Sequence, residues 1–228
     1  MTLFVLLSKW GLHRYYEERV GFELNEGAPM LLYVAMGMQE GDRAPGWSNG
    51  YILHIYGGES EFDGEKSTEL AVADIRDSMQ KFVEDPGYMG WFYLKKFTSQ
   101  WNDPSYQSFV MTHINEEARS GVVNSMYDGK LQWLMTWFMN QYQSLIFVGV
   151  FLCVIYRFWV EKPLEHQVLL IVIFGGFLFH MIWEAKGRYI LPYFVAMLPM
   201  AAVGLAECSR RMACRISRMC KKNEVADS

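Results

Sequence analysis

The chain has 228 residues, of which 51% are hydrophobic, 16% aromatic and 20% charged, and its formal net charge is −4. These averages combine a polar first half with an apolar second half. All four cysteines lie in the second half, which excludes a disulfide-stapled module from the first. A glycine-rich phosphate loop and paired metal-ligand spacings are absent from the sequence, which argues against common soluble nucleotide- or metal-dependent enzymes.

Residues 1–9 contain six apolar residues, too few to cross a bilayer. They also lack the positively charged segment and the small-residue cleavage site of a signal peptide. We therefore interpret residues 1–9 as the remnant of a transmembrane helix whose beginning is absent. This interpretation predicts that the chain is the C-terminal part of a larger polytopic protein, with a missing N-terminal transmembrane half as its partner.

Residues 10–141 are expected to form an extracytoplasmic domain of mixed, mainly helical structure. Residues 28–38 are apolar but too short for a span, and their pattern leaves a buried strand and an interfacial helix equally open. Residues 41–64 are rich in glycine and polar side chains, which predicts a loop. Within this loop, Trp47 and Tyr51 are candidates for stacking on sugar rings.

Two helices are predicted after this loop. Ser67–Glu84 has an amphipathic pattern typical of a helix at the surface of a domain. Tyr88–Trp101 is rich in aromatic residues around Lys95 and Lys96. It suits a membrane interface with snorkelling lysines, although a helix packed within the outer domain has a similar composition.

Residues 142–206 contain three apolar segments that predict three complete transmembrane helices, at 144–156, 168–183 and 189–206. If the last two formed a single helix, it would be roughly 58 Å long, about twice the thickness of the hydrocarbon layer. The chain must therefore reverse near Gly187. Together with the remnant at residues 1–9, these segments predict an α-helical polytopic membrane protein.

The tail, residues 207–228, carries six basic and no acidic residues between Ser209 and Lys222, so we assign it to the cytoplasm. Nucleic-acid binding is the competing interpretation of a basic run, but this run directly follows a predicted span. Counting back through the spans places the connector 157–167 inside and residues 10–141 outside. The predicted location is the cell membrane, with the lipid bilayer as a partner and no nucleic acid.

Three ionisable residues interrupt the apolar sequence where the last two spans meet: Glu184, Lys186 and Arg188. Charges at the rim of a helix bundle indicate a functional site by default. Arg188 and Lys186, beside Tyr189, could hold an anionic lipid headgroup, because arginine offers a planar donor fork and lysine a mobile charge. Alternatively, Glu184 pairs with Arg188 while Lys186 reaches solvent. His180 is interpreted as a hydrogen-bonded structural histidine.

The segment Lys186-Gly-Arg-Tyr-Ile-Leu-Pro, followed by Leu198-Pro199, resembles a stretch near the C-terminal side of C-type (GT-C) membrane glycosyltransferases. The longer Glu-Ala-Lys-x-Arg-Tyr-Ile-Leu-Pro-Tyr-Phe is similar to family 39-like proteins of Gram-positive bacteria, relatives of the protein O-mannosyltransferases. Proteins of this group also carry segments resembling Met36-Gly-Met, Gly46-Trp-Ser-Asn-Gly-Tyr and Gln100-Trp-Asn-Asp-Pro-Ser-Tyr-Gln-Ser.

The resemblance implies transfer of a sugar from a polyprenyl-phosphate carrier to an extracytoplasmic acceptor. Lys186, Arg188 and Tyr189 would bind the carrier phosphate, with Glu184 and His180 in support. The family's catalytic carboxylate lies in an earlier outer loop, so no catalytic residue is assigned here. No metal site is expected, the lipid-linked sugar is the donor, and cofactor use stays open. The rival hypothesis is a non-enzymatic membrane protein whose outer domain binds a cell-wall polymer or a protein partner.

Overall fold

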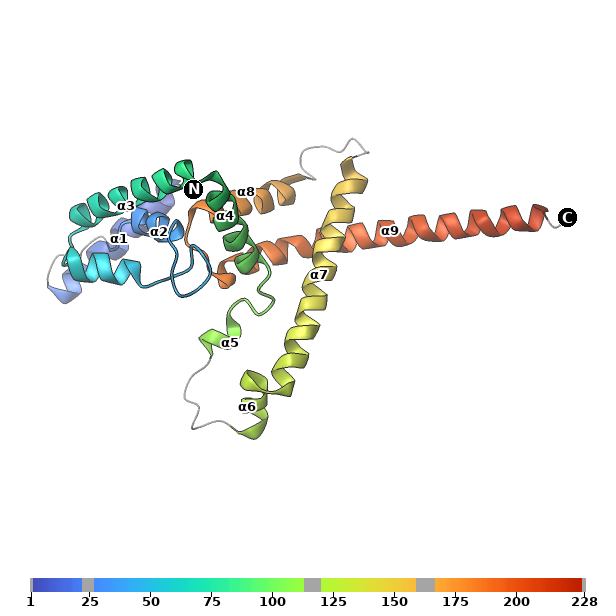
Figure 1. Cartoon of the computed structure of the whole chain (residues 1–228), viewed down its shortest axis with the longest axis horizontal. Helices are drawn as coiled ribbons and strands as arrows, with labels where there is room; N and C mark the ends of the chain where they lie inside the picture. The colour runs from blue at the N-terminus through green and yellow to red at the C-terminus, as the bar shows by residue number, and fades with distance from the viewer. Residues whose placement is uncertain (1, 22–26, 113–119, 159–166, 227–228) are drawn as a thin grey trace.

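The structure is a computed structural model of the chain that describes residues 2–21, 27–112, 120–158 and 167–226. These residues are almost entirely helical (Figure 1). Within the described ranges, the strand-type pairing is one isolated parallel bridge between Trp47 and Ala185. The expected α-helical fold class is therefore confirmed, while the outer region is helical and not mixed in the part that is described.

Helix α1 (Thr2–Val20) differs from the membrane remnant that we expected at residues 1–9. It continues without a break into a charged segment, where Arg14 and Glu18 lie 3.6 Å apart one turn from each other. Charged pairs of this kind are costly in a hydrocarbon layer. In the described part of the chain, α1 is accordingly not one of the helices that are long and apolar enough to span a membrane.

Four elements build the helical domain between residues 30 and 101: α2 (Met30–Gly37), the π-helix η1 (Leu53–Glu59), α3 (Gly64–Glu84) and α4 (Pro86–Trp101). The choice left open for residues 28–38 is thus settled in favour of a helix. The third helix begins earlier than its amphipathic pattern suggested, because the Asp63 carboxylate accepts hydrogen bonds from the N–H groups of Glu65 and Lys66.

Two buried apolar clusters hold these four elements together. The first lies between α2, η1 and α3 and includes Leu32, Met36 and Ile55. The second joins α3 to α4 through Phe82 and Phe92, whose ring centroids lie 5.1 Å apart at an interplanar angle of 57°. Burial of apolar and aromatic surface of this kind is the main source of stability for such a domain.

Two helices in the described residues are long and apolar enough to cross a membrane, and they lie in α7 (Lys130–Phe158) and in η4 (Gly187–Ile190) together with α9 (Leu191–Ala226). The third expected span corresponds to α8 (Val168–Ile182), which has 15 residues, fewer than the roughly 20 that a bilayer core requires. Our prediction of three full spans and a truncated fourth is therefore not matched by the described structure.

The first of these two helices also begins earlier than we predicted. It starts at Lys130, so residues 130–141, which we assigned to the outer domain, are part of α7. Two short helices precede it, α5 (Ser108–Met111) and α6 (Gly121–Asp128). Most of the connector that we placed in the cytoplasm, residues 159–166, lies outside the described residues.

Helices α7 and α9 cross each other (Figure 1), and small residues lie where they meet. A Cβ atom added to Gly149 would lie 2.7 Å from the backbone of Ala201, and one added to Gly204 would lie within 2.6 Å of the Cys153 backbone nitrogen. Small residues let two helix backbones approach closely, which is a common way for membrane helices to associate without a hydrophobic driving force.

Candidate anion-binding site

The turn between α8 and α9 is attached to the loop that follows α2. After α8 the chain is extended at Trp183, and the Ala185 N–H then donates a 2.7 Å hydrogen bond to the Gly46 carbonyl. This bond accompanies the parallel bridge between Trp47 and Ala185. The polar loop and the charged turn, more than 130 positions apart in sequence, are therefore neighbours in space.

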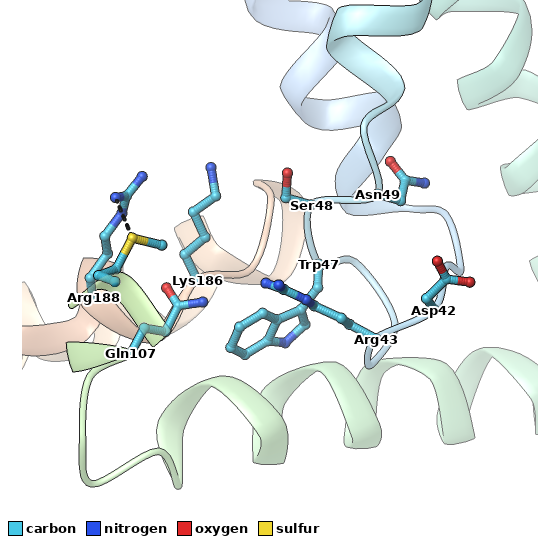
Figure 2. A pocket seen from close by; sticks show the side chains of 9 residues that line it. Asp42, Arg43, Trp47, Ser48, Asn49, Gln107, Lys186 and Arg188 are labelled. Atoms are coloured by element: carbon cyan, nitrogen blue, oxygen red, sulfur yellow. Dashed lines mark hydrogen bonds between the residues drawn. The ribbon is translucent and has the colours of Figure 1, made fainter. Parts of the chain in front are cut away.

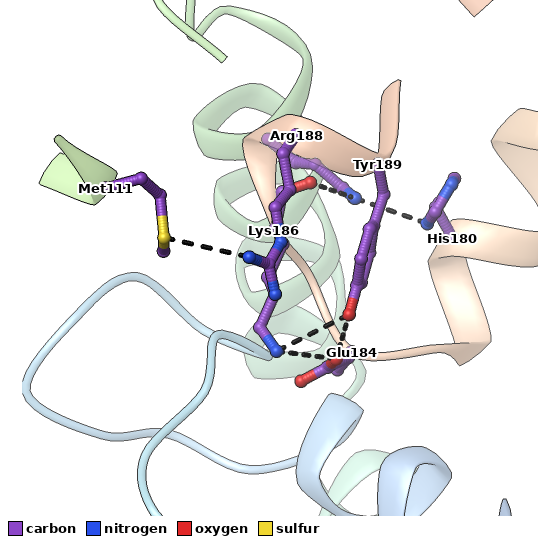
Figure 3. Close-up of polar contacts among 7 residues, drawn as sticks. Met111, His180, Glu184, Lys186, Arg188 and Tyr189 are labelled. Atoms are coloured by element: carbon purple, nitrogen blue, oxygen red, sulfur yellow. Dashed lines mark hydrogen bonds and ion pairs between the residues drawn. The ribbon is translucent and has the colours of Figure 1, made fainter. Parts of the chain in front are cut away.

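Glu184 pairs with Lys186, and not with Arg188 as our alternative proposed. The Lys186 Nζ lies 2.8 Å from Glu184 Oε1, and the Tyr189 hydroxyl donates a 2.6 Å hydrogen bond to the same oxygen (Figure 3). The Glu184 side chain is fully buried, and its Oε2 atom accepts no hydrogen bond from the described residues. A buried carboxylate requires a cation close by, so Lys186 is held in place by Glu184.

Arg188 is left without an acidic partner among the described residues. One of its terminal nitrogens contacts the Met111 sulfur at 3.7 Å, and its guanidinium carbon lies 5.6 Å from the centroid of the Tyr189 ring. Figure 3 shows the Arg188 side chain beside Lys186 and separate from the Glu184 carboxylate. Its positive charge is consequently available to a ligand.

The buried side chains of His180 and Gln100 pack against the turn between α8 and α9. His180 is buried, and its Nδ1 atom lies 3.2 Å from the Gln100 side-chain nitrogen. The same amide nitrogen donates a 3.3 Å hydrogen bond to the Lys186 carbonyl. The His180 ring also stacks near Tyr189, with centroids 6.2 Å apart. These contacts place His180 against the side chains that pack under Lys186 and Tyr189, and its role stays a prediction.

Lys96 is fully buried, whereas its sequence context suggested a snorkelling side chain. Its Nζ donates to the carbonyls of Gly37 at 2.6 Å and Met181 at 3.0 Å, which lie at the C-terminal ends of α2 and α8. Burial lowers the pKa of Lys96 to about 7. The carbonyls at the negative ends of the two helix dipoles favour the charged amine and therefore oppose this lowering of the pKa. Through its two hydrogen bonds, Lys96 joins α2 and α8 to α4.

Asp103 organises the segment between α4 and α5. One of its carboxylate oxygens accepts hydrogen bonds from the Ser105 N–H and hydroxyl, and the other accepts from the Gln107 N–H at 2.8 Å. Gln107 adopts a left-handed backbone conformation with φ of 63°. The segment lies so close to Gly187 that a side chain there would overlap the Asp103 carboxylate. Glycine at position 187 is thus required by a protein contact.

These segments enclose a polar cavity of about 430 Å³ (Figure 2). Its lining residues come from three separate parts of the chain: Asp42, Arg43, Trp47, Ser48 and Asn49; Gln107 and Met111; and Lys186 and Arg188. The lining contains three cationic side chains, Arg43, Lys186 and Arg188, and one carboxylate, Asp42, so the cavity has an excess of positive charge. Gln107 is buried, and its side-chain oxygen has no hydrogen-bond partner among the described residues.

A second cavity of about 460 Å³ adjoins the first at Arg188, which lines both. Its lining is mostly apolar and comes from the α4–α5 segment, α5, the first half of α7, η4 and the start of α9: Pro104, Ser105, Tyr106, Ser108, Met139, Tyr142, Gln143, Arg188 and Leu191. A cationic cavity next to an apolar one, with a shared arginine, has the shape and polarity that suit an amphiphilic anion.

The structure brings some of the predicted site residues together and leaves others apart. Trp47, Lys186 and Arg188 line the polar cavity, and the Trp47 indole N–H donates a 2.8 Å hydrogen bond to Ser99. Tyr51 lies elsewhere, because its ring is buried in the domain core and its hydroxyl donates to Asp74 at 2.5 Å. It is therefore not placed to stack on a sugar in this cavity.

Arg43 and Gln107 were not recognised as site residues from the sequence. Gln107 belongs to the segment 100–108 that carries part of the family resemblance, so its place in a motif was the available signal. Arg43 lies in a polar loop, and its sequence neighbours are the same as those expected for an arginine exposed to solvent. Its position in the cavity depends on the pairing between Trp47 and Ala185, which only the folded chain reveals.

Residues 46–50, Gly-Trp-Ser-Asn-Gly, have the spacing of a hydrolase nucleophile elbow. That motif requires a strained strand-to-helix turn and a nearby histidine base. Ser48 does not have a positive φ angle, and no described histidine hydrogen-bonds to it. The described residues also contain no group of three or more side chains arranged to bind a metal ion.

Searches of protein-family models, curated proteins and solved structures found no match to this chain.

Proposed function

We propose that the paired cavities bind a polyprenyl-phosphate-linked sugar, and that the chain is the carrier-binding part of an integral membrane glycosyltransferase. The observation that carries this proposal is the position of Arg188, which lines both the polar and the apolar cavity. A phosphate at Arg188 would place its sugar toward Trp47 and Asn49 and its isoprenoid chain toward Met139 and Leu191.

The electrostatics support a phosphate over a neutral headgroup. Arg188 and Arg43 make no ion pairs within the described residues, whereas Lys186 is balanced by Glu184. A planar guanidinium can give two parallel hydrogen bonds to phosphate oxygens. Negative charge grows on the carrier phosphate as the sugar leaves, and a fixed cation at that point stabilises the transition state. Arg188 would therefore act on the leaving group.

The family resemblance gains support from the way its pieces meet. Three of the four quoted segments, around residues 46–51, 100–108 and 186–192, are far apart in sequence, yet each contributes side chains to the polar cavity. The catalytic carboxylate expected for the family has no counterpart assigned in this chain. Asp42 is the carboxylate that lines the polar cavity, and Figure 2 shows it on the far side from Arg188.

The membrane topology belongs to the same proposal. Residues 10–129 would lie outside the cytoplasm and the basic end of α9 inside, with α8 completing the bundle as a short apolar helix. Single cysteines at Glu61 and Ser217, both exposed, would test this in a cysteine-free background with an impermeant thiol reagent. We expect labelling at 61 and not at 217 on intact cells, and the reverse pattern would contradict the orientation.

A photoreactive polyprenyl phosphate tests the binding site itself. With the reactive group in the first isoprene unit, we expect crosslinks near Met139, Tyr142 and Leu191 in the full chain in nanodiscs. Phe151, exposed on α7 away from the cavities, is the control for general lipid contact. Equal labelling at Phe151 would contradict a specific site. If the protein bound polyprenyl phosphate but transferred no sugar from it, the non-enzymatic alternative would be favoured.

A further inference from the structure

The C-terminal part of α9 is exposed on all sides beyond its contact with α7. The helix continues to Ala226, and every side chain described from residue 209 to residue 219 is exposed. In Figure 1 this part of α9 projects away from all the other helices. Near its start Arg211 contacts α7, with its guanidinium carbon 4.4 Å from the centroid of the Tyr156 ring.

Two stripes of side chains run along this exposed part. Met212, Ile216 and Met219 are separated by four and three residues, so they share one face of the helix, and each is more than half exposed. A second stripe with the same spacing, Arg211, Arg215 and Arg218, lies one residue earlier along the chain. It therefore lies about 100° around the helix, directly beside the apolar stripe.

The charges of the second stripe are only partly balanced. Glu207 pairs with Arg210 at 2.9 Å and with Arg211 at 2.7 Å. Arg215 and Arg218 make no ion pair among the described residues. The sequence contains no acidic residue from Cys208 to Lys222. A net positive face therefore borders an apolar stripe at the C-terminal end of the helix Gly187–Met219, which is long and apolar enough to span a membrane.

We propose that residues 209–219 bind the anionic surface of the membrane in which α9 is embedded. The apolar stripe would enter the interface, and Arg215 and Arg218 would contact lipid phosphates. Charge complementarity and the adjoining span identify the occupant as lipid. For the apolar stripe to reach the interface, α9 must bend between the end of its span and Met212. The inference does not depend on the ligand of the polar cavity.

Two probe positions separate surface binding from simple exposure. A nitroxide at Met212→Cys would report on the apolar stripe, and one at the native Cys214 would report on the opposite face, only two residues away. Each nitroxide would be attached to its own full-length variant, in which all other cysteines are replaced by alanine. The protein would be reconstituted in nanodiscs of pure phosphatidylcholine and of phosphatidylcholine with 30% phosphatidylglycerol, and oxygen and nickel-chelate accessibility would be measured.

With phosphatidylglycerol, we expect the probe at 212 to move into the oxygen-accessible layer while the probe at 214 stays in water. The Arg215→Gln/Arg218→Gln variant should reduce the ratio of bound to free tail by about fivefold for each arginine. High salt should have a similar effect. Two outcomes would overturn the proposal: equal water exposure at 212 in both lipids, or burial at 212 without phosphatidylglycerol together with crosslinking between two copies through that position.

Discussion

Glu184 and Lys186 form an ion pair of 2.8 Å in which the glutamate side chain is fully buried and the lysine side chain is 18% exposed. The asymmetry means that the two partners are not equivalent. Loss of the amine leaves a buried carboxylate whose one hydrogen-bond donor among the described residues is the Tyr189 hydroxyl. Loss of the carboxylate leaves an amine that can still reach water.

We therefore expect Lys186→Met to destabilise the protein by about 3–5 kcal/mol and Glu184→Gln by about 1–3 kcal/mol. The double variant Glu184→Gln/Lys186→Met should recover part of the loss seen in Lys186→Met, because the uncompensated charge is gone. Thermal unfolding in detergent measures all three. Equal losses in the two single variants would contradict the asymmetry.

Lys96 should make stability depend on pH. Its pKa is about 7 in the folded chain and 10.5 when unperturbed, so between these values the unfolded chain binds more protons than the folded chain. The free energy of unfolding should consequently rise from pH 7 to about pH 9.5. Above pH 10 the trend should weaken, because burial raises the pKa of Tyr106 to about 12, and ionisation then favours the unfolded chain.

Lys96→Met is the control for this effect, since methionine has a similar volume and does not titrate. We expect this variant to be less stable overall, because the carbonyls of Gly37 and Met181 lose their donor. Its stability should also be nearly flat between pH 7 and 9.5. A slope that persists in Lys96→Met would assign the pH dependence to other groups.

Gly187→Ala tests the link between the turn and the Asp103 segment. The added methyl group would overlap the Asp103 carboxylate, which positions Gln107, so ligand binding should fall with only moderate loss of stability. Gly90→Ala is a matched control, because a Cβ at that exposed helical position meets nothing within 4 Å. It should be neutral or stabilise the protein by about 0.5–1 kcal/mol.

The α7–α9 crossing is tested by Gly204→Ala. A Cβ at this position would overlap the Gly149 carbonyl, and we expect a loss of about 1–3 kcal/mol as the helices move apart. Gly175→Ala on α8 meets nothing within 4 Å and should have little effect. Similar unfolding midpoints for the two variants would show that the crossing does not require close backbone approach.

The sequence was most informative where composition alone decides structure. Apolar segments indicated the α7 and α9 helices, and the pattern of Ser67–Glu84 indicated α3 nearly to its ends. It overestimated α8, because we took an apolar segment of 16 residues as a complete span although its helix has only 15 residues, fewer than the roughly 20 that a bilayer core requires. It also misassigned Lys96, since a lysine that bonds two distant carbonyls has the same local pattern as one that reaches solvent.

The site was only partly predictable for a related reason. Lys186 and Arg188 stood out as charges between apolar segments, which is a local signal. The pairing of Glu184 with Lys186 over Arg188 depends on how Tyr189 and the 3₁₀ turn orient the side chains. Arg43 enters the cavity through a tertiary bridge between positions 47 and 185, and no short window of sequence contains that information.

The central claim is that Arg188 binds a lipid phosphate, and the affinity of the full chain for polyprenyl phosphate relative to polyprenol tests it most directly. Native mass spectrometry of the chain in nanodiscs would measure both lipids. We expect the wild-type protein to prefer the phosphate by about 10–100-fold, Arg188→Gln to abolish that preference, and Arg188→Lys to restore part of it. Thermal stability should be unchanged in both variants. An Arg188→Gln protein that keeps the full preference for phosphate would contradict the account.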